Sequence, residues 1–180
     1  MTVVWIIVAI ILVVGITFYN SFIWKKNKIE NALSDIEVQL KRRHDLIPNL
    51  VEIVQGYKKF ESDTLTKITE ARAEASHSKT LAHKAAAEDK LGWLVGRLFA
   101  VAESYPDLKS NQNFLDLQRE LSTIEDTIQS ARRYYNATVR EYNTLCETFP
   151  GNQIANQFKF QKKEFFEASA HEKGDLTIKM

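Results

Sequence analysis

The sequence predicts an all-α protein in which an N-terminal transmembrane helix leads into an elongated antiparallel helical bundle with long, coiled-coil-like helices. Three observations support this fold class. Only 6 glycines and 3 prolines occur among the 180 residues, so the chain can form few tight turns. Residues 1–24 carry no charged side chain. From Asn27 onwards, apolar residues recur at steps of three and four, which is the spacing of an amphipathic helix.

Residues 1–24 form the predicted membrane anchor. At 1.5 Å per residue, an apolar run of this length spans about 30 Å, the thickness of the hydrocarbon core of a bilayer. Trp5, Tyr19 and Trp24 lie near its ends, where aromatic rings favour the interface. A cleaved signal peptide is the alternative, but no basic side chain precedes the run and no small-residue cleavage site follows it. We therefore expect an uncleaved, single-pass helix in the lipid bilayer.

The distribution of lysines predicts the orientation of this anchor. Lys25, Lys26 and Lys28 follow the span directly, and the positive-inside rule then places residues 25–180 in the cytoplasm and the N-terminus outside. The single cysteine, Cys146, excludes an intramolecular disulfide and fits a reducing compartment. We expect residues 25–167 to form the cytoplasmic bundle and residues 168–180 to form a disordered tail.

The next segment continues as a helix without a break at Trp24. Its apolar positions follow one seam, with Arg43 in place of the one apolar residue that is missing; the seam comprises Ile29, Leu33, Ile36, Leu40, Ile47, Leu50, Val54 and Tyr57. An arginine on an apolar seam predicts an ion pair with a carboxylate of another helix, for which Glu120, Glu125 and Asp126 are available. Ligand binding is the alternative for Arg43 and its neighbours Arg42, His44 and Asp45.

Pro48 and Asn49 interrupt the pattern of this predicted helix. Proline lacks an N–H group, so the carbonyl of His44 loses its helical partner. We interpret Pro48 as a bend that curves a long helix around its bundle. Exposure of polar backbone to a partner is the alternative. Helical propensity continues through residues 64–68 and 70–75, and residues 76–80 predict a loop or a frayed end.

Two further helical patterns follow. The middle one covers residues 81–105, where Gly92 and Gly96 would allow a close approach of helices. The last has the most regular seam, with steps of three and four over about five heptads: Phe114, Leu117, Leu121, Ile124, Ile128, Ala131, Tyr135, Thr138, Tyr142, Leu145 and Phe149. Two helices of about 40 residues or more should pack antiparallel, with the middle helix as a third member.

Polar residues beside the last seam are candidate structural or interaction positions. Tyr135-Asn136 and Tyr142-Asn143 lie one heptad apart and predict polar layers that set the register of the helices. Residues 158–166 alternate aromatic and basic side chains, which predicts either a membrane-surface segment or an element that caps the bundle. The side chains concerned are Phe158, Phe160, Lys162, Lys163, Phe165 and Phe166.

The residues present argue against several functional classes. A formal net charge of +1 gives no electrostatic support for a nucleic-acid partner. Glu74 and His77 form one E-x-x-H step, but a di-iron carboxylate bundle needs a second, so we expect no metal. The chain has no nucleophile elbow, P-loop or dinucleotide-binding motif. We expect no cofactor and no catalytic residue.

These segments together resemble the LemA family of bacterial membrane proteins. The strongest match is residues 35–57, D-I-E-V-Q-L-K-R-R-H-D-L-I-P-N-L-V-E-I-V-Q-G-Y, and further matches lie at residues 71–73, 101–109, 114–117, 131–136 and 149–152. The resemblance implies a short outer N-terminus, one helix in the bacterial inner membrane and a cytoplasmic helical bundle. It implies no established enzymatic activity. Family members are often encoded near membrane metalloproteases of the HtpX type, and one branch belongs to magnetosome membranes.

The sequence therefore predicts a non-enzymatic, membrane-anchored scaffold or adaptor. It would act through homo-oligomer formation or through a membrane partner, for which an HtpX-type quality-control metalloprotease is a candidate. Two alternatives remain. One is a metal- or small-molecule-binding envelope enzyme with its site in the bundle core. The other is a protein that remodels the membrane surface through residues 158–166.

Overall fold

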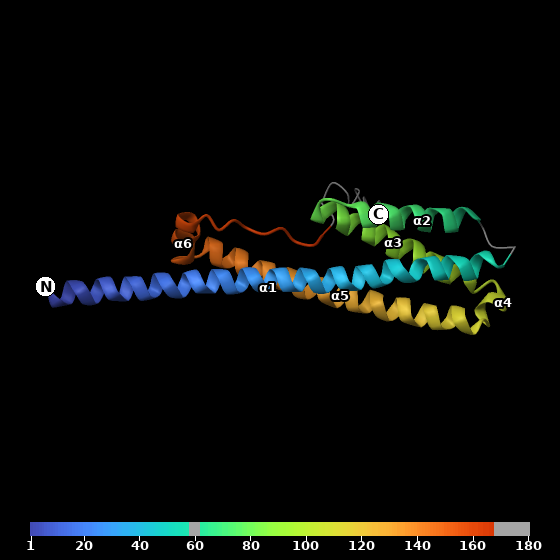
Figure 1. Cartoon of the computed structure of the whole chain (residues 1–180), viewed down its shortest axis with the longest axis horizontal. Helices are drawn as coiled ribbons and strands as arrows, with labels where there is room; N and C mark the ends of the chain where they lie inside the picture. Colours follow the sequence, from blue (N-terminus) through green and yellow to red (C-terminus); the bar gives the residue numbers. More distant parts are fainter. Residues whose placement is uncertain (58–61, 168–180) are drawn as a thin grey trace, which may run out of the picture. The chain divides into compact units, whose positions relative to one another are not determined.

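The computed structural model describes residues 1–57 and 62–167, and this part of the chain is helical with no β-strand (Figure 1). The helices are α1 (Thr2–Gln55), α2 (Ser62–His77), α3 (Leu81–Ala102), α4 (Pro106–Lys109), α5 (Gln112–Glu147) and α6 (Gly151–Phe158). The predicted fold class, a long N-terminal apolar helix followed by packed helices, is confirmed. The tail predicted for residues 168–180 lies outside the described residues.

Helix α1 is a single element of 54 residues, as expected from the absence of any breaker after Trp24. It contains one stretch that is long and apolar enough to cross a membrane, and none of that stretch is buried by the rest of the chain. The described residues divide into two compact units, and α1 and α5 each contribute to both.

Residues 64–75 are helical, as their propensity predicted, but they do not extend the first long helix. Helix α1 ends at Gln55, and Ser62–His77 forms a separate helix, α2, that packs against α3. The sequence signal for this end is Gly56, because glycine favours the position after a helix. Leu65, Ile68 and Ala71 are buried on α2, so its periodicity reflects a helix face of its own. The bundle therefore has one more member than the sequence predicted.

Local side-chain contacts fix the ends of the later helices. Thr80 caps α3, because its hydroxyl accepts the backbone N–H of His83 at 3.2 Å. Pro106 occupies the first turn of α4, where its missing N–H has no helical partner to lose. Asn111 precedes α5 and accepts the backbone N–H of Phe114 at 3.1 Å. These caps explain why the chain turns at residues 78–80 and 103–111.

The first unit comprises residues 1–35 and 133–165. Its α1 and α5 portions run antiparallel, because Phe22 meets Tyr142 edge to face at 5.8 Å while Lys28 lies over the ring of Tyr134 at 5.6 Å. Lys25 pairs with Glu141 at 3.0 Å between them. This unit also contains α6 and residues 159–165.

The described part of the second unit comprises residues 36–57, 62–132 and 166–167. Its apolar core joins α1, α2, α3, α4 and the first half of α5 through Ile47, Leu50, Val54, Leu65, Ile68, Leu91, Leu98, Leu108, Phe114 and Leu121. The predicted α5 seam is largely buried across both units, including Tyr135 and Tyr142. Phe149 is the exception, because it lies beyond the end of α5 and is 81% exposed.

The carbonyl group freed by Pro48 has a specific partner. Pro48 lies inside α1, and Arg72 of α2 donates from Nε to the carbonyl oxygen of His44 at 2.7 Å. A guanidinium from a neighbouring helix therefore replaces the amide that proline cannot supply. This contact ties α2 to α1 and leaves the His44 carbonyl occupied, which opposes the alternative that Pro48 exposes it to a partner.

We expect Arg72 and Pro48 to be energetically coupled. Arg72→Met should destabilise the protein by about 1–3 kcal/mol, because it leaves a part-buried carbonyl without a donor. In a Pro48→Ala background the new N–H can bond to His44, so the same substitution should cost less. Urea unfolding of the four full-length variants in detergent, followed by circular dichroism, measures this cycle. Equal costs in the two backgrounds would show that Arg72 acts independently of Pro48.

Candidate functional site: the buried charge cluster at Arg43

Arg43 lies in the interior of the second unit, 3% exposed, and contacts two other helices. Its Nη1 donates to Glu125 Oε2 of α5 at 2.5 Å. Its Nη2 donates to the main-chain oxygen of Glu88 on α3 at 3.0 Å, and also to the Glu88 carboxylate. Glu125 is one of the three carboxylates that the sequence offered. Glu88 was missed.

Glu88 is the more deeply buried of the two carboxylates, with 2% exposure. His44, the next residue after Arg43, places its Nε2 atom 2.9 Å from Glu88 Oε1. The approach is not aligned as a hydrogen bond, so both atoms lack a well-directed partner within the described part of the chain. We therefore treat His44 and Glu88 as a close electrostatic contact.

The surroundings of Glu88 keep it charged. Burial raises the pKa of this carboxyl, but the neighbouring His44 and Arg43 outweigh burial and hold its pKa below the ordinary value. A negative Glu88 and a partly exposed, negative Glu125 then face one permanently charged guanidinium.

Helix α3 makes room for this cluster through Gly92, one turn after Glu88. A Cβ atom at Gly92 would lie 3.4 Å from Arg43 Nη1 and 3.5 Å from Glu125 Oε2. The predicted close approach of helices therefore holds at Gly92. It does not hold at Gly96, where a Cβ atom would meet nothing within 4 Å.

Two shallow clefts flank the cluster. One, of about 190 Å³, lies between α3 and α5 and is lined by Gly92, Val95, Gly96, Phe99, Leu121, Ser122 and Asp126, as well as Arg43 and Glu125. The other, of about 280 Å³, is lined by His44, Glu88, Asp45, Arg72, Lys41 and Lys84 among others. In the second, Arg72 and Lys84 already bond to His44 and Glu37, so few donors remain to hold a ligand.

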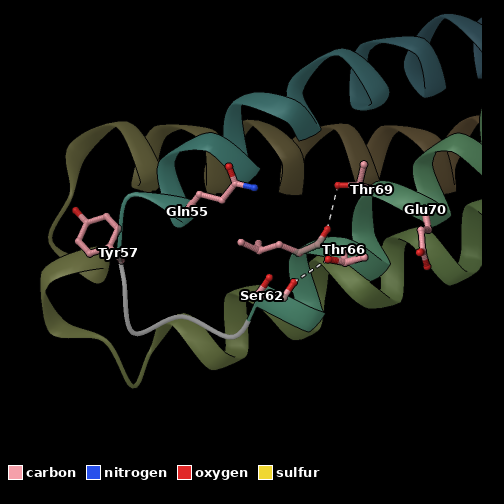
Figure 2. Close-up of a pocket in the computed structure, with 7 residues that line it drawn as sticks. Gln55, Tyr57, Ser62, Thr66, Thr69 and Glu70 are labelled. Carbon is pink, nitrogen blue, oxygen red and sulfur yellow. Dashed lines mark hydrogen bonds between the residues drawn. The ribbon is translucent and has the colours of Figure 1, made fainter.

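A larger hollow, of about 480 Å³, lies where α1 ends and α2 begins (Figure 2). Its lining is Gln55, Tyr57, Ser62, Leu65, Thr66, Thr69 and Glu70. The hydroxyls of Thr66 and Thr69 donate to the carbonyls of Ser62 and Leu65 one turn earlier in α2, so they do not point to a common centre (Figure 2). The hydroxyl of Tyr57 is also engaged, because it accepts from Asn111 Nδ2 at 3.0 Å.

The other candidate positions near Arg43 lie at the surface. Arg42 is exposed and pairs with Glu120 of α5 at 2.7 Å. Asp45 and Asn49 are exposed on α1. The structure thus separates this stretch into one buried residue with a network of partners and several residues on the outer face of the helix.

The sequence predicted that the tyrosines and asparagines of α5 form polar layers between helices. In the structure, Tyr135 and Asn143 instead bond to main-chain atoms. Asn143 makes two hydrogen bonds of 2.9 Å to the backbone N–H and carbonyl of Lys163. Tyr135 donates its hydroxyl to the carbonyl of Glu164 at 3.0 Å. Their polar atoms therefore bind the extended chain after α6. Asn136 is half-buried. Tyr142 is buried, and burial raises the pKa of its hydroxyl to about 12.

Residues 158–166 divide into buried and exposed side chains. Phe160 stacks on Phe22 at 4.6 Å, and Phe166 is 1% exposed beneath the guanidinium of Arg132. Lys162 pairs with Glu147. Phe158 and Phe165 remain exposed. Much of the segment therefore packs back on the helices, as expected of a capping element, and its contact with a membrane stays a prediction that rests on Phe158.

The residues considered for metal or nucleophilic chemistry are engaged elsewhere. Glu74 pairs with Lys90 at 2.7 Å, and His77 Nδ1 contacts the carbonyl of Ala73 at 2.7 Å. Within residues 1–57 and 62–167, no group of three or more His, Cys, Asp or Glu side chains is placed to hold a metal ion. Burial raises the pKa of the Cys146 thiol, which disfavours the nucleophilic thiolate.

Fold and site together define a helical protein whose N-terminal helix is suited to membrane association and whose interior is organised by a charge cluster. The LemA family profile matches residues 32–180. The chain is 31% identical to Protein LemA of Metamycoplasma hominis over 175 residues, 92% of this chain and 79% of the relative.

Two more distant relatives carry a different name. The chain is 26% identical to magnetosome protein MamQ of Magnetospirillum gryphiswaldense, covering 89% of this chain and 68% of that protein. It is 25% identical to magnetosome protein MamQ 2 of Paramagnetospirillum magneticum, covering 83% and 64%. With the family profile matched over most of its length, this chain belongs to the LemA family, which confirms the resemblance seen in the sequence.

The two adjacent arginines of α1 provide a matched test of burial. Arg43→Met should lower the free energy of unfolding by about 3–5 kcal/mol, because it leaves the buried Glu88 carboxylate without its cation. Arg42→Met should cost less than about 1 kcal/mol, because its ion pair is exposed to solvent. Urea unfolding of full-length variants measures both. Equal losses at the two positions would contradict a special role for Arg43.

Glu88 should also make stability depend on pH. Because its pKa is lower in the folded chain, its contribution is present above its unfolded pKa of about 4.3 and is lost as the pH falls through the folded pKa. We expect a smaller loss of stability below about pH 4 in Glu88→Gln than in the parent. Unfolding midpoints measured at several acidic pH values test this. Parallel pH profiles for the two proteins would show that Glu88 does not contribute to the loss of stability at acidic pH.

Proposed function

We propose that this chain is a non-enzymatic, membrane-anchored helical scaffold. One observation carries the proposal: the apolar, unburied stretch of α1 continues, without a break, into the part of the same helix that supplies Ile47, Leu50 and Val54 to the bundle core. The anchor and these core residues therefore belong to one secondary-structure element, with no linker between them. A flexible tether would instead need residues that interrupt the helix.

The anchor places the bundle in the cytoplasm of a bacterial cell and the N-terminus outside. Lys25, Lys26 and Lys28 support this orientation, because basic residues after a span are retained on the cytoplasmic side. Aromatic residues at both ends, including Trp24 with Lys28 5.5 Å from its ring, are typical of the interface. The names of the two MamQ relatives, magnetosome proteins, are compatible with a role at a membrane.

The outer face of α3 provides the surface for assembly or for a membrane partner. Trp93 is 62% exposed, and the guanidinium of Arg97 lies 5.5 Å from its ring. Gly96 and Ala100 continue the same exposed face and leave the helix backbone accessible. Tryptophan and arginine are the residues most enriched at the energetic centres of protein interfaces. We define this set as the Trp93 face. A second copy, or a membrane metalloprotease, is the proposed partner.

Native mass measurement of the full-length protein in mild detergent tests the scaffold proposal. We expect an assembly larger than the monomer, or a stable complex with a co-purified membrane protein. Trp93→Ala should raise the dissociation constant of this assembly or complex tenfold or more, because truncating a residue at the centre of an interface costs about 2 kcal/mol. Tyr134→Ala, at a residue 51% exposed on α5, is the control and should leave it unchanged.

The same proteins in inverted membrane vesicles test the orientation, because added protease should digest the bundle there. A strictly monomeric, partner-free protein, or a bundle protected inside the vesicles, would overturn the corresponding part of the proposal.

A further inference from the structure

Helix α6 lies against the anchor helix on the bilayer side of the lysines. Phe158, its last residue, contacts the ring of Tyr19 at 4.9 Å, and Phe160 stacks on Phe22. Tyr19 precedes Lys25 by six residues of continuous helix, which is about 9 Å along the axis. The headgroup region on each side of the hydrocarbon core is roughly 5–8 Å thick. A bilayer that holds Lys25 among its headgroups therefore brings Phe158 to the edge of the hydrocarbon.

The position of α6 is fixed by packing that only glycine permits. A Cβ atom at Gly151 would lie 2.3 Å from the carbonyl oxygen of Leu145. Gly151 and Ala155 are buried, so this face of α6 rests on the first unit. Phe149 and Phe158, at its two ends, remain 81% and 53% exposed. Large aromatic side chains exposed at both ends of a packed, amphipathic helix indicate a second apolar environment.

A groove runs between Phe158 and the anchor helix. It has a volume of about 450 Å³ and is lined by Ile11, Leu12, Gly15, Ile16, Tyr19 and Phe158. Gly15 borders the open space of this groove, because a Cβ atom there would meet nothing within 4 Å. Five of the six lining residues belong to the membrane-spanning stretch, so the groove is continuous with the surface that already faces lipid.

A basic residue follows the groove residue Phe158 directly. Lys159 ends α6 in the left-handed conformation, with a φ angle of 57°. Its side chain is exposed, and Lys26 of α1 is half-buried and lies 3.8 Å from Glu30. Lysine side chains beside an apolar surface extend their ammonium groups towards lipid phosphates. An apolar groove beside basic residues therefore fits an amphiphile with an acidic head and an acyl chain.

We propose that α6 is a second membrane contact, in which Phe149 and Phe158 enter the bilayer interface and the groove beside Gly15 holds an acyl chain of an anionic bilayer lipid. This inference rests on the anchoring of α1 that is part of the proposed function. It moves the membrane-binding segment from residues 158–166, whose central part packs on the helices, to the two ends of α6. It also predicts that the first unit contacts the membrane at two points, the anchor and α6.

Spin labels on the full-length protein test this inference. In a Cys146→Ser background, single cysteines at positions 12, 134, 149 and 158 carry a nitroxide, and the protein is reconstituted in vesicles of phosphatidylcholine and phosphatidylglycerol. Power saturation compares collisions with oxygen, which concentrates in lipid, and with a water-soluble nickel chelate. Circular dichroism verifies that each variant retains the helicity of the parent.

Leu12 is the lipid-facing control and Tyr134 is the aqueous control. Residue 134 lies thirteen residues before Glu147, the end of the antiparallel α5, which is about 20 Å in helical rise. We expect labels at 12 and 158 to favour oxygen several-fold, the label at 149 to be intermediate, and the label at 134 to favour nickel. Omission of phosphatidylglycerol should lower the oxygen preference at 158, because the basic residues then lose their partner.

Each other outcome has a definite meaning. Labels at 149 and 158 that resemble 134, with 12 in lipid, overturn the α6 contact and leave the anchor intact. An aqueous label at 12 overturns both the anchor and this inference. Dipolar broadening at 158 without an oxygen preference places a second copy in the groove and overturns the lipid assignment. An oxygen preference at 158 that is independent of lipid charge retains the apolar contact and overturns the choice of an anionic lipid.

Discussion

The buried guanidinium of Arg43 is the constraint on which the packing of the second unit depends. A permanent charge 3% exposed is tolerable only if carboxylates reach it, and here they come from α3 and α5. Helix α3 must therefore present Glu88 to α1, with Gly92 one turn later because a side chain there would crowd the guanidinium. Apolar contacts alone would allow the helices to slide along one another. The charge cluster fixes their axial register, because Arg43 of α1 must lie level with Glu88 of α3 and Glu125 of α5.

A second polar contact joins α2 to the same segment of α1. Pro48 leaves the carbonyl of His44 without a helical donor, and Arg72 supplies one. Two consecutive residues of α1 thus organise three other helices: Arg43 binds α3 and α5 by its side chain, and His44 binds α2 by its backbone. The family motif around these residues is best explained as this architectural centre. The surfaces available for binding lie elsewhere, on the Trp93 face and at the ends of α6.

Sequence patterns predicted the helices well where one face of the helix carries the information. The unbroken helix from the membrane span to the core-forming part of α1, the α5 seam and the need of Arg43 for a carboxylate partner all follow from steps of three and four. The separate helix α2 was missed because Gly56 alone is a weak signal between two helical segments. Glu88 could have been found, since it interrupts the apolar face formed by Ala85, Leu91 and Val95. Nothing in the sequence pattern identifies Arg72 as the donor to His44.

Composition and periodicity establish properties of single segments: an uncharged span of membrane length, helix starts and stops, and an arginine that must be neutralised. Those properties depend on neighbours along the chain. The packed helices were needed to show which carboxylates reach Arg43, that Tyr135 and Asn143 bind the backbone after α6, and that Phe158 faces the anchor helix. These contacts join residues distant in sequence, and their partners are backbone atoms or single side chains that leave no periodic trace.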